Sequence, residues 1–509
     1  MKIERIRPTN WPLRLLEVAI TYIFVILAHG YIYGHRDMIE ITPYVKYLLN
    51  PELFPNDFFI QNLVERFPNE RYAFVHFLKI FGAPNPWIYW GLHLSFSFLM
   101  ISGFLNMAEL FIKEKKLVYF AAFLAFIVLY PYNLGGNNLY NNMLTPGFVA
   151  SSIGIWSLYY LVRAYDHRSI LLLIPATFIH PLVGLQLFII YTGVFAVRLI
   201  TKQFFRKSKS LILSMLAYIL TAGVWMYWLF QTFSKGQIAD ETFFEIIQFR
   251  LAHHFIPSAF GGGNYALLIP MFLIGWHLNL KRNARLFWVF NIVLLGLIVY
   301  SIAVEGFHAS FFISTQWFKT TMWLKILASI AIVFVGNQAV MLWASKWKSK
   351  LVTLGMVLLG VAGIFLGLKF NQRHADTRDF PWTGIYTDAQ KIAIKAKEST
   401  PADALFLTPP NFTYLKHYGE RSTYVDYKAI VHHKTAMQEW YRRVKQVFQF
   451  DGSAKNSLER LNIASLPTDL AAIQKYQSLG ITHLITEQSI DSGKLLDQAG
   501  KYYLYEIKE

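Results

Sequence analysis

Long apolar segments, separated by shorter polar ones, fill the first two thirds of the chain. At about 1.5 Å per helical residue, a segment of about 20 residues crosses a hydrocarbon core about 30 Å thick. The pattern predicts about eleven transmembrane helices. They occupy residues 11–31, 87–111, 117–132, 145–162, 170–179, 182–199, 211–230, 265–277, 286–304, 321–343 and 351–368. The first is longer than the apolar core of a signal peptide, so we interpret it as a retained helix.

A different pattern begins near residue 370. Helical periodicity at residues 388–398, 438–447 and 469–479 is interleaved with short strand-like runs at 404–408, 422–426, 482–486 and 502–507. Short strands between helices are typical of a small α/β layer domain. The predicted fold class is therefore a membrane all-α domain at residues 1–369, followed by a soluble α/β domain at residues 370–509.

The charged residues indicate how the helices are oriented. Basic side chains gather in alternate connections, which are cytoplasmic by the positive-inside rule. These residues are Lys113, Lys115, Lys116, Arg163, Arg168, Arg198, Lys202, Arg206, Lys207, Lys209, Lys281, Arg282, Arg285, Lys346, Lys348 and Lys350. The remaining connections include the long loops 34–86 and 232–263, which we place outside. An odd number of spans after a cytoplasmic N-terminus makes the C-terminal domain extracytoplasmic.

Composition narrows the function classes. Hydrophobic residues make up 54% of the chain and charged residues 16%, a balance typical of a protein embedded in lipid. Most of the net charge of +17 lies before residue 370 and reflects the cytoplasmic loops, so we expect no nucleic-acid partner. The absence of cysteine excludes disulfides and thiolate metal sites. The sequence also has no glycine-rich phosphate loop with lysine, which argues against an ATP-driven pump.

Two carboxylates stand immediately after the first predicted span. Asp37 lies about where this helix leaves the hydrocarbon, and Glu40 shares its face if the helix continues. A carboxylate at the membrane edge is costly enough to be a functional candidate. The structural alternative is that Asp37 pairs with Arg36 or with an interfacial lysine and only orients the helix. We predict that Asp37 and Glu40 are catalytic.

A basic and aromatic constellation lies in the second long outward loop. Arg250, His253 and His254 together present one guanidinium and two imidazoles within five residues. Such a group can grip a phosphate, with the arginine binding it through two donors. Metal ligation by the histidines and a purely interfacial anchor are the alternatives. We predict that these residues bind the phosphate of a substrate.

Further polar residues share this predicted outer side. Lys319 follows the ninth span and is a further candidate for phosphate binding. His180, Asp57 and His308 are candidates for substrate binding. Each residue by itself is weak evidence, because a histidine at a helix end is commonly a cap. The prediction rests on their all lying on the same predicted side of the membrane. An asparagine-rich turn at residues 133–142 could hydrogen-bond a sugar.

The arrangement resembles the GT-C glycosyltransferases, which use polyprenyl-phosphate-linked sugars. The resemblance rests on the overall architecture and on two local segments. These are Tyr33-Gly34-x-x-Asp37 with Phe54-Pro55-Asn56-Asp57-Phe58-Phe59, and Arg250-x-x-His253-His254. They are similar to segments of a bacterial branch with no assigned activity, so the resemblance does not supply a substrate.

The resemblance implies an inverting sugar transfer at the outer face of the bacterial cytoplasmic (inner) membrane. The donor would be a polyprenyl-phosphate sugar, and the acceptor a glycan, a lipid or a protein. In this family the acid of the first loop acts as general base or helps to hold a divalent metal, Mg²⁺ or Mn²⁺, and we carry that role onto Asp37. The second acid of many members is replaced here by the more distant Glu40, which leaves metal dependence open.

Two other functions fit the same features. A transporter or flippase for a lipid-linked saccharide would use the same cations, but it should place ionisable residues at mid-membrane depth. A non-catalytic subunit of an envelope polysaccharide assembly system would bind a partner through its exported domain. Such a subunit would work without Asp37.

Overall fold

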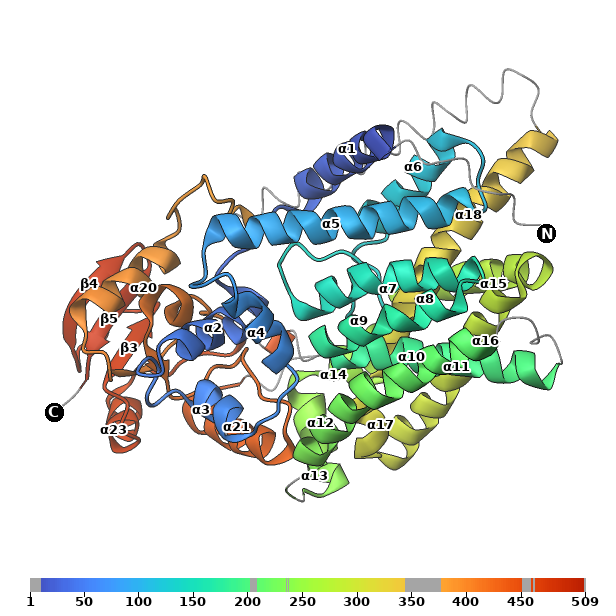
Figure 1. The fold of residues 1–509 in the computed structure, drawn as a ribbon. Helices are drawn as coiled ribbons and strands as arrows, with labels where there is room; N and C mark the ends of the chain where they lie inside the picture. The colour runs from blue at the N-terminus through green and yellow to red at the C-terminus, as the bar shows by residue number, and fades with distance from the viewer. Residues whose placement is uncertain are drawn as a thin grey trace.

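The computed structural model describes residues 11–201, 208–234, 236, 238–343, 377–450, 459–460 and 463–507. A helical part comes first, and a smaller part built around a β-sheet packs against one end of it (Figure 1). The predicted fold class, a membrane all-α domain followed by a C-terminal α/β domain, is confirmed. The predicted boundary at residues 369 and 370 lies outside the described residues, as does the predicted span 351–368.

Six helices or joined helices are long and apolar enough to cross a membrane. They are Trp11–His29 (α1), Pro86–Glu109 (α5), Pro181–Ile200 (α10), Lys209–Phe233 (α11, η3 and α12), Ala284–Gly306 (α16 and η5) and Ser310–Ala339 (α17, η6 and most of α18). The other predicted spans that fall within the described residues are also helical. They form Lys115–Phe123 (α6) with Leu124–Val128 (η2), Pro146–Val162 (α7), Asp166–Leu171 (α8), Leu173–Ile179 (α9) and Gly262–Arg282 (α15). All but α15 are short for a membrane span.

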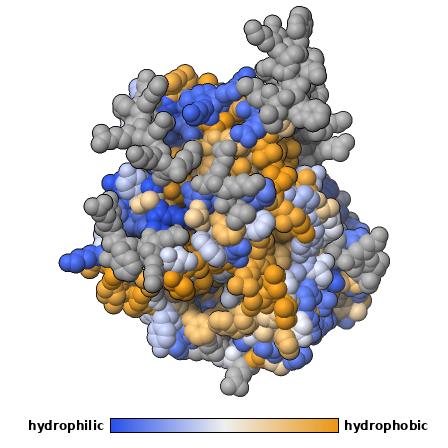
Figure 2. Space-filling view, turned by 90° about the vertical axis from the view of Figure 1, so that its right-hand side faces the viewer, coloured by the Kyte–Doolittle hydropathy of each residue, from blue (hydrophilic) through white to orange (hydrophobic). Residues whose placement is uncertain are grey.

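The helical part exposes many large apolar side chains. Leu213, Leu220 and Leu295 are 66%, 69% and 63% exposed. Figure 2 shows broad hydrophobic areas on the face remote from the sheet, with hydrophilic patches beside them. Lipid tails are as apolar as leucine, so these side chains suit a bilayer and would be a liability in water.

The first long loop, residues 34–86, folds into short helices rather than remaining extended. They are Arg36–Glu40 (η1), Thr42–Leu49 (α2), Phe58–Glu65 (α3) and Tyr72–Lys79 (α4). Prolines at residues 43, 51, 55 and 68 divide the loop into these pieces, because proline cannot continue a helix interior. The helices lie beside the sheet-containing part in Figure 1. The second long loop forms Asp240–Arg250 (α13), Ala252–Phe255 (α14) and Pro257–Phe260 (η4).

The C-terminal domain has a five-stranded mixed sheet in the order β2-β1-β3-β5-β4. The strands are Leu405–Leu407 (β1), Ser422–Thr423 (β2), His483–Thr486 (β3), Lys494–Ala499 (β4) and Tyr502–Glu506 (β5). Parallel pairing joins β1 to β2 and β3, whereas β5 is antiparallel to β3 and β4. The helices are Asp388–Ser399 (α20), Lys434–Val447 (α21) and Leu470–Ser478 (α23), and Leu415–Gly419 (η8) precedes β2.

The strand and helix predictions for this domain are confirmed with two differences. The strand predicted at 422–426 is only two residues long, because the chain leaves the sheet after Thr423. Strand β4 was not expected from the sequence. It is an edge strand whose side chains are mostly exposed, so it lacks the alternation of apolar and polar residues that marks a half-buried strand.

Candidate functional site

Asp37 lies at the junction of the two parts of the protein. Its carboxylate forms an ion pair with the Lys428 ammonium at 2.6 Å, and Lys428 belongs to the C-terminal domain. The charge of Lys428, followed by those of Arg250 and Arg36, lowers the pKa of Asp37 although burial opposes this. Protein surrounds Asp37, yet 45% of its side-chain surface remains accessible. An ionised and accessible carboxylate can accept a proton or a hydrogen bond from a ligand.

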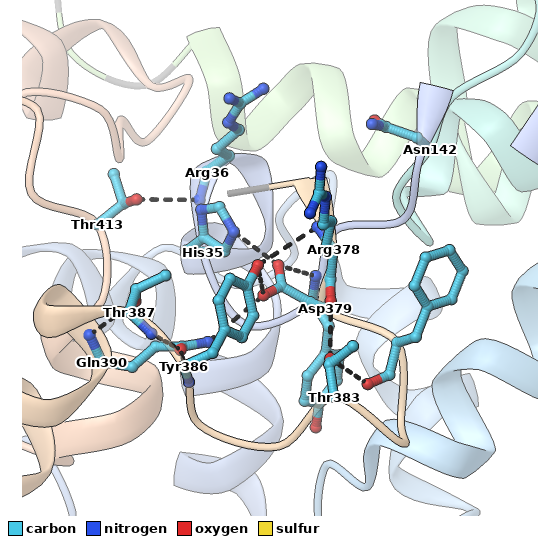
Figure 3. Close-up of polar contacts among 12 residues, drawn as sticks. His35, Arg36, Asn142, Arg378, Asp379, Thr383, Tyr386, Thr387, Gln390 and Thr413 are labelled. Carbon is cyan, nitrogen blue, oxygen red and sulfur yellow. Dashed lines mark hydrogen bonds and ion pairs between the residues drawn. The ribbon is translucent and has the colours of Figure 1, made fainter. Parts of the chain in front are cut away.

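A buried network fixes the backbone that carries Asp37 (Figure 3). The Asp379 carboxylate contacts His35 Nε2 at 2.7 Å and accepts a hydrogen bond from the Tyr33 amide at 3.1 Å. The Tyr386 hydroxyl donates to its other oxygen at 2.9 Å. Gly34 is required here, because its φ is +80° and an added Cβ would lie 2.4 Å from the His417 ring. The C-terminal domain therefore holds the turn that presents Asp37.

Arg250 ends α13 and points at the same segment of the C-terminal domain as Asp37. Its Nε donates to the Tyr427 carbonyl at 3.0 Å, and its guanidinium lies 5.0 Å from the centre of the Tyr427 ring. The side chain is almost fully buried. Desolvation lowers the pKa of Arg250, but a guanidinium keeps its charge in proteins. The charge of Arg250 also acts on the Asp37 carboxylate, so the two side chains lie near each other.

The two histidines of α14 lie beside Arg250 with their rings 4.1 Å apart. Burial, and then the charge of Arg250, lowers the pKa of His253 to about 3. Burial also lowers the pKa of His254 well below its usual value, and its Nδ1 lies 3.3 Å from the Gly135 carbonyl. Both imidazoles are therefore neutral at pH 7 and can donate a hydrogen bond. They add no positive charge, so the charge for binding a phosphate comes from Arg250 and not from the histidines.

Lys319 lies in Trp317–Thr320 (η6) and adds a further cation to the cluster of Asp37, Arg250, His253 and His254. Asp37 and Glu40 are its anionic neighbours, and within the described part of the chain no hydrogen bond or ion pair joins its ammonium to another residue. The asparagine-rich turn packs against this region. Gly135 and Gly136 have φ values of +78° and +66°, and an added Cβ would collide with Phe318 and with the His254 ring. The two glycines therefore bring the turn close to the cluster.

Glu40, predicted as a second catalytic acid, lies near Lys319 and is engaged by a neighbouring cation. Its carboxylate is paired with Arg71 at 2.5 Å, and the same guanidinium contacts Glu70 and donates to the Ile430 carbonyl at 3.0 Å. Glu70 in turn pairs with His432 at 3.1 Å. This chain of contacts joins the first loop to the C-terminal domain. We assign Glu40 to that junction, because Arg71 already engages its carboxylate.

The three residues predicted to bind substrate separate in the structure. His180 caps α10, with its Nδ1 accepting from the Val183 amide at 3.3 Å, although it remains near Lys319. His308 stacks on Phe244 at 3.9 Å, and among the described residues no interaction joins it to the cluster. Asp57 is fully buried and contacts Lys416, so it is closed to a ligand. Of the three, only His180 borders the candidate site.

The residues around Asp37 do not fit a divalent metal. The charged groups nearest to its carboxylate are the cations Lys428, Arg250 and Arg36, whose charges oppose a second cation. A hard cation such as Mg²⁺ requires several oxygen ligands, and no group of three or more His, Cys, Asp or Glu side chains in the described ranges could hold one. The chemistry of the cluster is that of an anion site beside the accessible carboxylate of Asp37.

Sequence reasoning missed Lys428 and Tyr427. Both lie in a short irregular segment after β2, and nothing in the local pattern relates them to Asp37, nearly four hundred positions earlier. Without a known docking geometry, Lys428 could not be told apart from the other lysines of the C-terminal domain.

Residues 387–447 match a family model described as a domain of unknown function, DUF6798. No curated protein matches the chain. Among solved structures, the chain is similar to ArnT from Cupriavidus metallidurans in the apo state. The sequence identity is 12%, the TM-score is 0.47, and the match covers 97% of each chain. The roles assigned to residues of this chain come from its own geometry.

Proposed function

We propose that this protein is a membrane glycosyltransferase that moves a sugar from a polyprenyl-phosphate donor to an acceptor at the outer face of the membrane. One observation carries the proposal. A single accessible carboxylate, Asp37, lies among cations contributed by separate segments, namely Arg250, Lys319 and Lys428. This is the pairing that inverting transfer from a sugar phosphate requires, with one base and several charges for the leaving group.

The proposed reaction assigns a role to each group. Asp37 takes the proton of the acceptor hydroxyl while the acceptor oxygen attacks the anomeric carbon. The bond between that carbon and the phosphate oxygen breaks, and polyprenyl phosphate leaves with the electron pair. Lys319, Lys428 and Arg250 stabilise its negative charge, and neutral His253 can donate a hydrogen bond to it.

Lys428 links the two halves of this scheme. In the free protein it pairs with Asp37 and lowers the pKa of the carboxylate, which weakens the base. A bound donor phosphate would compete for the same ammonium. The pKa of Asp37 would then rise, so that the base gains strength only when the donor is present.

The location of the charges favours an enzyme over a transporter. Lys325 is the buried lysine within the last described span, and its ammonium donates to the Leu129 and Tyr132 carbonyls at 3.1 and 2.9 Å. Its ammonium thus binds backbone carbonyls that follow η2. It is not a free mid-membrane charge of the kind that transporters use. The remaining cluster lies at the end of the bundle where the C-terminal domain packs.

A direct test uses the purified protein in nanodiscs with polyprenyl-phosphate sugars and candidate acceptors. We expect release of polyprenyl phosphate that depends on both substrates, and accumulation of the lipid-linked donor in cells that lack the gene. Movement of the intact donor across vesicle membranes without cleavage would support the flippase function instead. Full complementation by a protein lacking the Asp37 carboxylate would support the non-catalytic subunit.

The proposed orientation can be tested because the chain has no cysteine. Single cysteines at Ser399 and Ser210, both exposed, can be labelled with a membrane-impermeant maleimide in intact cells. We expect the Ser399→Cys protein to react and the Ser210→Cys protein to react only after the membrane is opened. The reverse result would place the site on the cytoplasmic side.

Arg250 is expected to contribute donor binding through its geometry as well as its charge. Replacing Arg250 with lysine keeps the charge but removes the planar fork, including the donor to Tyr427. We expect the apparent affinity for the donor to fall about tenfold or more, the loss of about one charged hydrogen bond. Lys209→Arg, at the opposite end of the bundle, is the control. Unchanged donor affinity in Arg250→Lys would make this segment a structural anchor.

A further inference from the structure

Three charged side chains are buried together where the first loop meets the C-terminal domain. Lys416 in η8 has no solvent-exposed side-chain surface, and its ammonium contacts the carboxylates of Asp57, at 3.1 Å, and Asp426. The ammonium also lies 4.8 Å from the centre of the Phe59 ring. Burying charges is costly, and well-packed apolar residues are often at least as stabilising as a buried ion pair. Stability alone therefore explains this triad poorly.

Both carboxylate oxygens of Asp57 accept hydrogen bonds. Its Oδ1 accepts from the Ile60 amide at 2.9 Å and from Lys416, so it caps α3 while holding the lysine. Its Oδ2 accepts from both the amide and the hydroxyl of Thr423, at 2.9 and 3.0 Å. Donors from three separate segments thus converge on one carboxylate, and the single hydroxyl proton of Thr423 is shared between Asp57 and Asp426. These hydrogen bonds tie the first loop to the residue at which β2 ends.

The triad also holds the next residues of that segment. The Asp426 carboxylate contacts Lys416 and lies 2.8 Å from the Thr423 hydroxyl, while its carbonyl accepts from Trp440 Nε1 at 2.8 Å. The following residue, Tyr427, offers its carbonyl to Arg250, and Lys428 pairs with Asp37. The irregular segment from Thr423 to Lys428 is therefore fixed by buried charges immediately before it enters the candidate site.

We infer that Asp57, Lys416 and Asp426 form a positioning device that holds residues 423–428 so that Lys428 faces Asp37 and the Tyr427 carbonyl faces Arg250. The inference rests on the function proposed above for Asp37 and Lys428. It makes the three buried residues positioning residues, because they touch the segment that carries Lys428 and not the substrate. It also gives Asp57 a role other than the substrate binding predicted from the sequence.

Asp57→Asn is the variant that tests the device with least risk to folding. Asparagine is as good an N-cap as aspartate, and the remaining Lys416–Asp426 pair is neutral. However, an amide has one acceptor oxygen and one donor nitrogen, so it cannot receive donors at both ends. If the asparagine oxygen accepts from Ile60 and Lys416, its nitrogen faces the Thr423 amide. Two donors then face each other, so the hydrogen bond that holds residues 423–428 is lost. Glu420→Gln is the matched control, since Glu420 pairs with Lys46 of the first loop at 2.6 Å but lies outside the segment.

The position of Lys428 can be read without measuring transfer. In an Asp37→Cys protein the only thiol stands where the carboxylate was, and the pH dependence of its alkylation by iodoacetamide gives its pKa. A facing ammonium should hold this thiol below the usual value of about 8.5. We expect the added change Lys428→Met to raise the pKa and Asp57→Asn to raise it comparably. Glu420→Gln should leave it unchanged.

Transfer kinetics give the second readout. We expect Asp57→Asn to lower kcat/KM by about 10²-fold, the size reported for a misplacement of about 1 Å in a site. Combined with Lys428→Met it should add little further loss, because both changes remove the same ammonium from the site. The inference would be overturned if the loss in the double variant equalled the product of the two single losses. It would also be overturned if the thiol pKa responded to Lys428→Met but not to Asp57→Asn. Absence of transfer by the unmodified protein would reject the proposed function, while the thiol titration would still decide the positioning.

Discussion

Asp37→Asn is expected to lower the turnover of sugar transfer by about 10² to 10⁴ while leaving folding and donor binding nearly intact, as the loss of a general base does. The amide has almost the same shape as the carboxylate but cannot take the acceptor proton. Donor affinity can even improve, because the substitution removes a negative charge next to Lys428 and Arg250. The measurement is kcat and KM for polyprenyl-phosphate sugar with purified, monodisperse protein.

Two controls distinguish this role from others. Glu40→Gln should cost much less turnover, because Glu40 is held by Arg71 at the domain junction. Treatment of the unmodified enzyme with EDTA should leave turnover unchanged, since the groups around Asp37 are cations and do not fit a metal. Near-normal transfer by a well-folded Asp37→Asn protein would contradict the assignment of Asp37 as the general base and would favour the transporter function.

Lys416→Met is expected to have the largest effect on stability, about 3 to 5 kcal/mol, the cost of breaking a buried ion pair on one side. Methionine fills much of the space but leaves the carboxylates of Asp57 and Asp426 buried without their cation. The measurement is the thermal or denaturant unfolding of the purified protein, followed by its elution as a single species in size-exclusion chromatography.

The matched comparison is Lys501→Met, which removes an exposed lysine paired with Glu487 at 2.8 Å and should cost about 1 kcal/mol or less. The triple change Asp57→Asn, Lys416→Met, Asp426→Asn should recover part of the lost stability, because no uncompensated charge then remains. Equal stability of Lys416→Met and Lys501→Met would show that the two carboxylates do not depend on the lysine.

Some parts of the candidate site follow from the chain alone. Asp37, Arg250, His253 and Lys319 were expected on one side because each stands at the end of a predicted span or in an outward loop. The positive-inside rule sorts loops by their lysine and arginine content, so it can bring together residues that are distant in sequence without any knowledge of helix packing. That sorting says which end of the bundle a residue occupies, but not which neighbour it touches.

Other assignments could not be made from local pattern. Asp37, Glu40 and Asp57 are all acidic residues in the same long loop, yet one is accessible, one is paired with Arg71 and one is buried against Lys416. A carboxylate that caps a helix and one that serves as a base look alike in sequence, because their difference lies in the donors that surround them. The neutral state of His253 and His254 likewise depends on burial by other segments.

The sequence by itself determined the membrane-spanning helices, the layered C-terminal domain and the side on which the polar residues gather, because these follow from hydrophobic length, periodicity and loop charge. Only the tertiary structure decided that the C-terminal domain completes the site. Lys428 meets Asp37 across nearly four hundred residues, and that contact depends on the docking of the tail onto the first loop through the buried Lys416. The geometry of such docking arises from packing between separate segments, which no local pattern records.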